Sequence, residues 1–121
     1  MARAMWQAAG LALACSVAGG GASAQGTQQL FGVASYYGEN YIGAVASGPR
    51  YDPKQFTTAH RTLPFGTRVL VTDPKSHRRV VLTVNDRGPF IKGRVLDLSL
   101  AAAKVLHMTD RGLIQVTAAV Q

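Results

Sequence analysis

The chain has 121 residues, a formal net charge of +7 and 47% hydrophobic residues, with one cysteine and three histidines. This length supports one small domain, and a single cysteine excludes a framework of intrachain disulfide bonds. The histidines lack the spacing of metal ligands, and the sequence has neither a G-x-S-x-G elbow nor a glycine-rich phosphate loop. We therefore expect no metal and no cofactor.

The first 24 residues have the pattern of a secretory signal peptide. A short segment with Arg3 precedes an apolar run at 8–18, and residues 22–24 (Ala-Ser-Ala) suit a signal peptidase. The run is shorter than the roughly 20 residues that span a bilayer. We expect a secreted or periplasmic protein. The alternative is a lipid anchor through Cys15.

The charge of the exported part indicates an anionic partner. Removal of 24 residues leaves 97, with 12 Lys and Arg against six acids. A basic surface attracts anionic polymers, and export argues against nucleic acid. Peptidoglycan and other envelope polymers are therefore the expected partners. The alternative is that the excess charge only keeps the protein soluble.

The exported chain alternates short strand-like runs with Gly and Pro turns. Residues 25–30 form a polar linker, and the domain is expected over 31–121. Residues 38–49 predict a long loop, because they hold three glycines and a proline. Strands are expected at 31–37, 67–72, 79–85 and 113–120, with a further strand-like run at 95–96, and a short helix at 100–107 with Ser99 as its N-cap. This pattern predicts a mainly β closed barrel with one short helix.

The segment 84–99, V-N-D-R-G-P-F-I-K-G-R-V-L-D-L-S, carries the strongest functional signal. Asp86 and Asp97 each follow an apolar run, and Gly88 lies in the turn between them. Two carboxylates at strand ends beside a fixed loop suit acid/base chemistry. The structural alternatives are an Asx-type turn for Asp86 and competition with helix capping for Asp97.

His60 is the third candidate, because it lies between a β-tending run and a Leu-Pro-Phe-Gly corner. A fixed imidazole can orient a carboxylate, donate a proton or polarise a sugar oxygen. The alternative is a structural histidine that ties a turn. His77 is expected in an exposed turn, and His107 at the C-terminus of the helix.

Several long motifs resemble the rare-lipoprotein-A family. They are G32-V-A-S-Y-Y-G38, A46-S-G48, T57-T-A-H-R-T-L-P-F-G-T67, V84-N-D-R-G-P-F90 and G93-R-V-L-D-L-S-L-A-A-A103. The resemblance implies an envelope-located, six-stranded double-psi β-barrel related to expansins and barwins. It also implies endolytic peptidoglycan lytic transglycosylase activity, which cleaves MurNAc-GlcNAc bonds and leaves 1,6-anhydromuramyl products.

Carried over by motif, the resemblance makes His60, Asp86 and Asp97 the catalytic residues. We expect Asp86 to be the acid/base, supported by the other two, although the two aspartates could exchange roles. One position departs: Pro49 stands where active members commonly have a carboxylate. Asp52 could compensate, but it matches a different motif residue. Candidate substrate contacts are Tyr36, Tyr37, Tyr41 and Tyr51, by stacking on sugars, and Arg87 and Arg94.

Two other functions remain open at this stage. The departure at Pro49 favours a non-catalytic, expansin-like module that binds glycan. A scaffold that docks division-machinery partners through the basic surface is the third. The expected partners are peptidoglycan glycan strands and not nucleic acid, with association to the outer membrane or the division machinery as a further option, and the expected state is a monomer.

Overall fold

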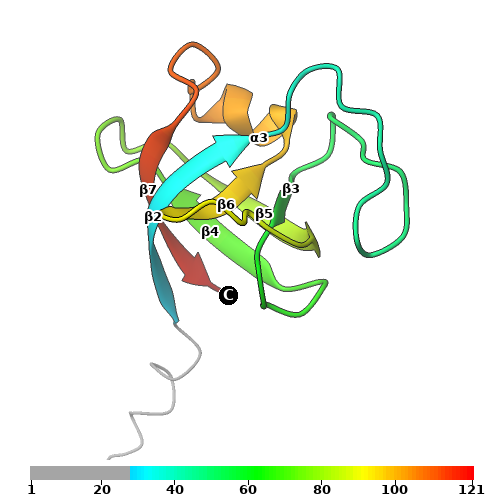
Figure 1. Ribbon diagram of the computed structural model, residues 1–121. Helices are drawn as coiled ribbons and strands as arrows, with labels where there is room; N and C mark the ends of the chain where they lie inside the picture. Colours follow the sequence, from blue (N-terminus) through cyan, green and yellow to red (C-terminus); the bar gives the residue numbers. More distant parts are fainter. Residues whose placement is uncertain (1–27) are drawn as a thin grey trace, which may run out of the picture.

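The computed structural model describes residues 28–121 (Figure 1). The expected signal peptide and Cys15 lie outside the described residues. The described part is a six-stranded closed barrel with one short helix, as the sequence predicts. Its elements are β2 (Gln29–Tyr36), β3 (Thr57–Ala59), β4 (Arg68–Thr72), β5 (Arg79–Asp86), β6 (Arg94–Leu98), α3 (Leu100–Val105) and β7 (Ile114–Val120).

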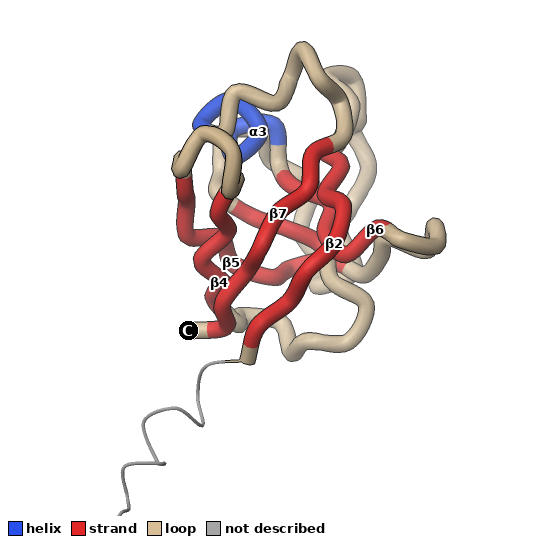
Figure 2. Tube along the Cα trace, turned by 90° about the vertical axis from the view of Figure 1, so that its left-hand side faces the viewer, coloured by secondary structure: helices blue, strands red, loops and turns tan. Residues whose placement is uncertain are grey.

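The order of strands around the barrel is β2, β6, β3, β5, β4 and β7, and β7 pairs with β2 to close it (Figure 2). The β2–β6 and β3–β5 pairs are parallel, and the other pairs are antiparallel. Parallel neighbours cannot be joined by a tight hairpin, so they come from separated parts of the chain. The barrel thus brings segments before residue 60 next to segments after residue 83.

Alternating apolar side chains fill the barrel, as its size requires. In β4, β5 and β7 the buried residues are separated by exposed or half-buried ones. The helix α3 closes one end of the barrel (Figure 2) and contributes two buried alanines. The fully buried large side chains include Val69, Val71, Leu82, Val84, Leu96, Leu98, Leu106 and Met108. A core of this kind fixes the register of each strand, because a slip by one residue would expose it.

Strand β5 carries one extra residue just before its end. Val84 pairs with Thr58 of β3, and Asp86 pairs with Ala59, the next residue of β3. Asn85 is therefore a bulge residue. An extra residue reverses the alternation of side chains along a strand. Asp86 consequently leaves the inward row of β5.

The predicted elements differ from the structure mainly at their ends. β2 begins at Gln29, two residues earlier than expected, because residues 29–30 pair with the end of β7. The helix ends at Val105 and not at 107, since His107 has a left-handed φ of 53°. The side chain of Ser99 accepts the Ala102 N–H, which confirms the predicted N-cap.

An ion pair between the buried Asp73 and the exposed Arg111 ties the β4–β5 turn to the segment before β7. Arg111 Nη2 donates to Asp73 Oδ2 at 3.0 Å, and Asp73 is 1% exposed. The same carboxylate accepts the Lys75 N–H and the Ser76 hydroxyl. Burial alone would raise the pKa of Asp73, but these hydrogen bonds together outweigh burial and lower it. Its stabilising contribution is therefore present above the ordinary pKa of Asp, about 3.9, and is lost as the pH falls through the folded value.

Replacement of Asp73 by Asn should lower the free energy of unfolding at neutral pH by about 2 kcal/mol, because a buried hydrogen bond to a charged partner is weakened. Urea denaturation checks this value. The matched control is Asp110→Asn at an exposed position, which should change stability by less than about 0.5 kcal/mol. Equal effects of the two substitutions would contradict the structural role of Asp73.

Candidate active site

The two predicted aspartates flank one residue of β3. Ala59 pairs with Asp86 of β5 on one side and with Asp97 of β6 on the other. Asp97 lies between two fully buried leucines of β6, so its side chain points away from the core. The bulge in β5 turns Asp86 out of the inward row as well. The barrel thus brings both carboxylates to one region, as the sequence predicts.

The Asp86 carboxylate accepts three hydrogen bonds. Oδ1 accepts the backbone N–H of Ala46 at 2.7 Å and that of Arg87 at 2.9 Å. Oδ2 accepts the Tyr37 hydroxyl. The Ala46 contact joins the long loop between β2 and β3 to the site. An Asx-type turn would have the Gly88 N–H as donor, whereas the donor here is the N–H of the next residue, Arg87.

The Asp97 carboxylate is held from β2 and lies beside a glycine. Ser35, which pairs with Asp97 across the β2–β6 ladder, donates its hydroxyl to Oδ1. A Cβ placed on Gly88 would lie 3.6 Å from Oδ2. Gly88 has a φ of +125°, which L side chains rarely adopt, so a side chain there would strain the loop that covers Asp97.

His60 follows Ala59 directly and is nearly buried. Its Nδ1 accepts the backbone N–H groups of Thr62 and Leu63 at 3.1 and 3.0 Å. Nδ1 is therefore an acceptor, which places the proton of the neutral ring on Nε2. Burial lowers the pKa of His60, and the positive charges of Arg61 and Arg87 lower it further. The ring is neutral at physiological pH and ties the turn at 61–63.

Three of the predicted tyrosines form one cluster. Tyr37 and Tyr51 stack with ring centroids 4.5 Å apart, and Tyr41 meets both rings edge-on. Tyr51 is only 5% exposed, and its hydroxyl accepts the Leu100 N–H. Tyr51 therefore supports the cluster from beneath. Tyr41 is exposed and presents the cluster to solvent.

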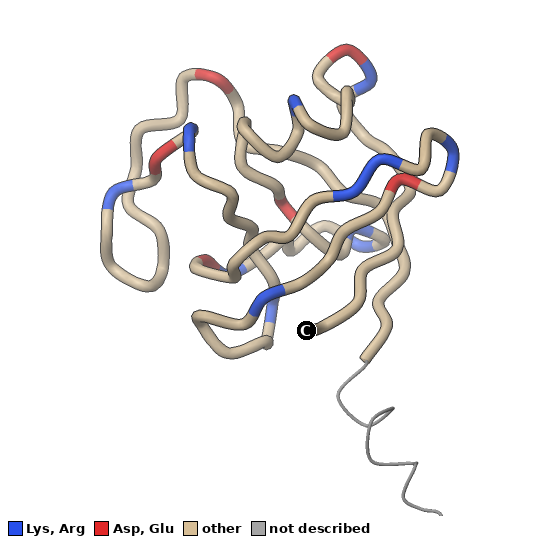
Figure 3. The backbone as a smooth tube through the Cα atoms, turned by 180° about the vertical axis from the view of Figure 1, so that it is seen from behind, with Lys and Arg blue, Asp and Glu red and all other residues tan. Residues whose placement is uncertain are grey.

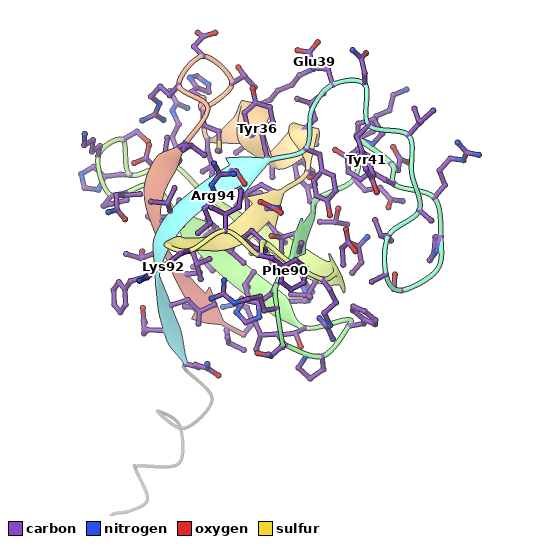
Figure 4. All side chains as sticks on the ribbon, viewed as in Figure 1. Tyr36, Glu39, Tyr41, Phe90, Lys92 and Arg94 are labelled. Atoms are coloured by element: carbon purple, nitrogen blue, oxygen red, sulfur yellow. The ribbon has the colours of Figure 1, made fainter. Side chains whose placement is uncertain are left out.

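Tyr36 lies apart from this cluster, beside α3 (Figure 4). It packs against the core, and its hydroxyl donates to the Thr109 carbonyl at 3.0 Å. Adjacent residues of a strand point to opposite faces, so Tyr36 and Tyr37 separate. The structure does not bring Tyr36 to the aspartates.

The predicted arginines have different surroundings. Arg87 donates to the carbonyls of His60 and Leu63, and its guanidinium lies 4.0 Å from the centroid of the Phe65 ring. Arg87 thus fixes the loop that carries His60. The Arg94 side chain makes no hydrogen bond or ion pair within residues 28–121, and Arg94 is the first residue of β6 (Figure 4).

Two exposed phenylalanines near the site were not predicted. Phe90 is 79% exposed, and its ring would lie 3.5 Å from a Cβ placed on Gly88. Figure 4 shows Phe90 at the front of the barrel. Phe65 is 43% exposed and packs on Arg87. Their positions in the G-P-F and L-P-F-G turns could have indicated them, because an aromatic residue in a tight turn cannot reach the core.

Pro49, the position that departs from the family pattern, lies in the loop between β2 and β3 that contacts Asp86. The Pro49 carbonyl accepts the Val45 N–H at 2.9 Å and closes a tight turn, stabilised by an Ala44–Arg50 bridge. Asp52, the carboxylate that could compensate for Pro49, is exposed, and its Oδ1 accepts the Lys54 N–H at 2.9 Å.

Lys and Arg positions are spread over several separate segments of the described backbone (Figure 3). Within residues 28–121 no three His, Cys, Asp or Glu side chains converge as metal ligands would. No helix among these residues has the length and hydropathy of a membrane span.

A pocket of about 290 Å³ lies away from Asp86 and Asp97, against Asp73, Lys75 and Arg111, and none of the predicted site residues lines it.

Comparison with known proteins identifies the family. A family model described as "Lytic transglycolase" matches residues 29–118. The chain belongs to the lytic transglycolase family. The family expected from the motifs is thereby confirmed.

Two relatives of this lytic transglycolase chain are named as transglycosylases. The probable endolytic peptidoglycan transglycosylase RlpA of Nostoc sp. is 51% identical over 88 residues, which cover 70% of this chain and 24% of that protein. The endolytic peptidoglycan transglycosylase RlpA of Haemophilus influenzae is 49% identical over 86 residues, covering 70% of this chain and 30% of that one. The chain spans less than a third of the length of either relative.

Two solved structures share the fold. A Streptomyces papain inhibitor superposes with a TM-score of 0.63 and 28% identity, covering 78% of this chain and 96% of that one. An apo expansin of Clavibacter michiganensis superposes with a TM-score of 0.62 and 24% identity, covering 78% and 50%. The expansin likeness supports the fold alone.

The neutral state of His60 has a consequence for stability. Because its folded pKa lies below the ordinary value of about 6.5, His60 contributes stability that is fully present above that pH and is lost as the pH falls through the folded pKa. His60→Asn keeps an acceptor for the turn but does not titrate. The loss of unfolding free energy between about pH 7.5 and about pH 5 should be smaller in this variant than in the wild type.

Urea denaturation at the two pH values measures this difference. The control is His77→Asn, which removes a histidine from an exposed turn, and the two variants are compared for their change in stability between the two pH values. If His60→Asn loses as much unfolding free energy between the two pH values as the wild type does, the pKa of His60 is not lowered by folding.

Proposed function

We propose that this domain is the catalytic part of an endolytic peptidoglycan transglycosylase that acts in the cell envelope. The observation that carries the proposal is the pairing of Asp86 and Asp97 on either side of Ala59, with His60 next in the chain. Family membership and relatives named as peptidoglycan transglycosylases support the same reaction. The substrate is the glycan strand, cleaved between MurNAc and GlcNAc.

Asp86 serves as acid and then as base. Its carboxyl proton passes to the oxygen that joins the two sugars, and the bond between this oxygen and muramyl C1 breaks. The carboxylate then takes the proton of the muramyl C6 hydroxyl, whose oxygen bonds to C1 and closes the 1,6-anhydro ring. Asp86 ends in its starting protonation state, and no water is consumed. The carboxyl spacing that separates classes of hydrolase therefore does not apply.

Asp97 and His60 support this step in different ways. Asp97 places a second carboxylate on the other side of Ala59, where it stabilises positive charge that develops at C1. His60 is neutral, and its Nδ1 is occupied by two backbone donors. Its Nε2–H is therefore the group left to donate to a sugar oxygen.

The exposed rings around the site supply surfaces for sugars. Tyr41, Phe65 and Phe90 are each at least 40% exposed. Aromatic faces of this kind stack on the apolar faces of pyranose rings. Tyr37 and Tyr51 support Tyr41 from below, and Arg94 is available to bind anionic groups of the glycan.

The second candidate function is glycan binding without turnover. It is favoured by Pro49, which stands where the family commonly has a carboxylate and lies in the turn whose Ala46 N–H contacts Asp86. Binding would then use the same exposed rings but leave the strands intact. Digestion of peptidoglycan separates the two functions.

Incubation with purified peptidoglycan, intact and stripped of stem peptides, should release products with 1,6-anhydromuramyl ends, which mass spectrometry detects. Asp86→Asn should reduce their formation at least about 100-fold, because general acid/base catalysis is removed. Asn keeps an oxygen to accept the Ala46 and Arg87 N–H groups, so the site should keep its shape.

Asp110→Asn at the exposed turn before β7 is the control and should retain full activity. Retention of the Asp86→Asn protein on a peptidoglycan pellet shows that this variant still binds the glycan. Binding by the wild type without any anhydro product would instead establish the glycan-binding function.

A further inference from the structure

We propose that Tyr37 and Ser35 are positioning residues, which hold the two aspartates through hydroxyl groups supplied by one segment of the chain. This inference rests on the proposed function. Ser35 lies in β2, and Tyr37 follows the last residue of that strand. Residues two apart on a strand share a face, so both hydroxyls point to the same side. Ser35 donates to Asp97 and Tyr37 donates to Asp86.

Backbone pairing with β6 fixes the positions of Ser35 and Tyr37 relative to the aspartates. Ser35 pairs with Asp97 in the β2–β6 ladder, and the Tyr37 N–H donates to the Leu98 carbonyl at 3.0 Å. The Tyr37 ring is also fixed, because it stacks on the buried Tyr51. Both hydroxyls are therefore held before any substrate binds.

The two oxygens of Asp86 have unequal partners, and this determines which oxygen carries the proton. Oδ1 accepts two backbone N–H groups, from Ala46 and Arg87, and backbone donors cannot become acceptors. Oδ2 accepts only a hydroxyl, which can turn and accept in return. The transferred proton accordingly resides on Oδ2, because the Tyr37 hydroxyl can hydrogen-bond to this oxygen in both of its protonation states.

Tyr37 keeps its own proton throughout the reaction. Burial raises the pKa of its hydroxyl, and the hydrogen bond to Asp86 and the charges of Asp86 and Asp97 raise it further. When Oδ2 bears the proton, the Tyr37 oxygen accepts from it. After that proton has moved to the glycosidic oxygen, the Tyr37 O–H donates to the carboxylate. The proton returned by the muramyl C6 hydroxyl restores the first arrangement.

The test compares Tyr37→Phe with Tyr36→Phe. Each variant removes one tyrosine hydroxyl, but the Tyr36 hydroxyl bonds to Thr109 beside α3. Tyr37→Phe should lower kcat roughly 10-fold to 100-fold with KM changed less than about twofold, because a hydrogen bond to a charged group is lost in the reacting state. Tyr36→Phe should keep the kcat of the wild type.

Ser35→Ala and Ser35→Thr form a second pair. Ala removes the hydroxyl that holds Asp97, whereas Thr keeps it and suits a strand. Ser35→Ala should lower kcat in the same manner, and Ser35→Thr should restore most of it. Full kcat in both Tyr37→Phe and Ser35→Ala would overturn the positioning proposal.

A readout without turnover separates this proposal from the proposed function. In protein labelled with ¹³C at aspartate, the carboxyl carbon signal of Asp86 should shift in Tyr37→Phe and stay in place in Tyr36→Phe. If the wild type makes no anhydro product but these shifts occur, the proposed function fails and the positioning contact stands. Unchanged Asp86 signals in Tyr37→Phe would refute the contact itself.

Discussion

The short strand β3 determines where the acids of this domain lie. Its last residue, Ala59, pairs with Asp86 on one side and with Asp97 on the other, and His60 comes next in the chain. A three-residue strand between β5 and β6 is possible only because the barrel is closed and its fully buried side chains hold each strand in register. The geometry of the site is therefore a consequence of the packing of the core.

The sequence was sufficient to predict the barrel and the approach of the two aspartates to one region. Strands β4 and β5 have regular alternation and β-branched residues, and Gly88 and Gly93 mark the turn that separates the acids. The orientation of Asp86 could not be predicted in this way. It depends on the bulge at Asn85, which arises from pairing with β3 and has no local glycine or proline to indicate it.

The partners of the site residues also depended on tertiary structure. Ser35 and the backbone of Ala46 contact the aspartates from segments about 40 to 60 residues away in the chain. The tyrosines looked alike in sequence, yet Tyr51 is buried, Tyr36 turns toward Thr109 and Tyr37 reaches Asp86. Strand alternation predicts only that Tyr36 and Tyr37 separate, and not which of them faces the acids. His60 ties the turn that follows it, as the structural alternative expects, and its role toward a sugar stays a prediction.

In the proposed reaction, glycan strands are cleaved where β5 and β6 present their aspartates beside β3. A crystal structure of the domain with a glycan fragment ending in 1,6-anhydro-MurNAc tests this claim most directly. We expect the anhydro bridge to lie within hydrogen-bond distance, about 3 Å, of Asp86 Oδ2, with the neighbouring sugars against Tyr41 or Phe90. A fragment bound on another face of the barrel, out of reach of both aspartates, would contradict it.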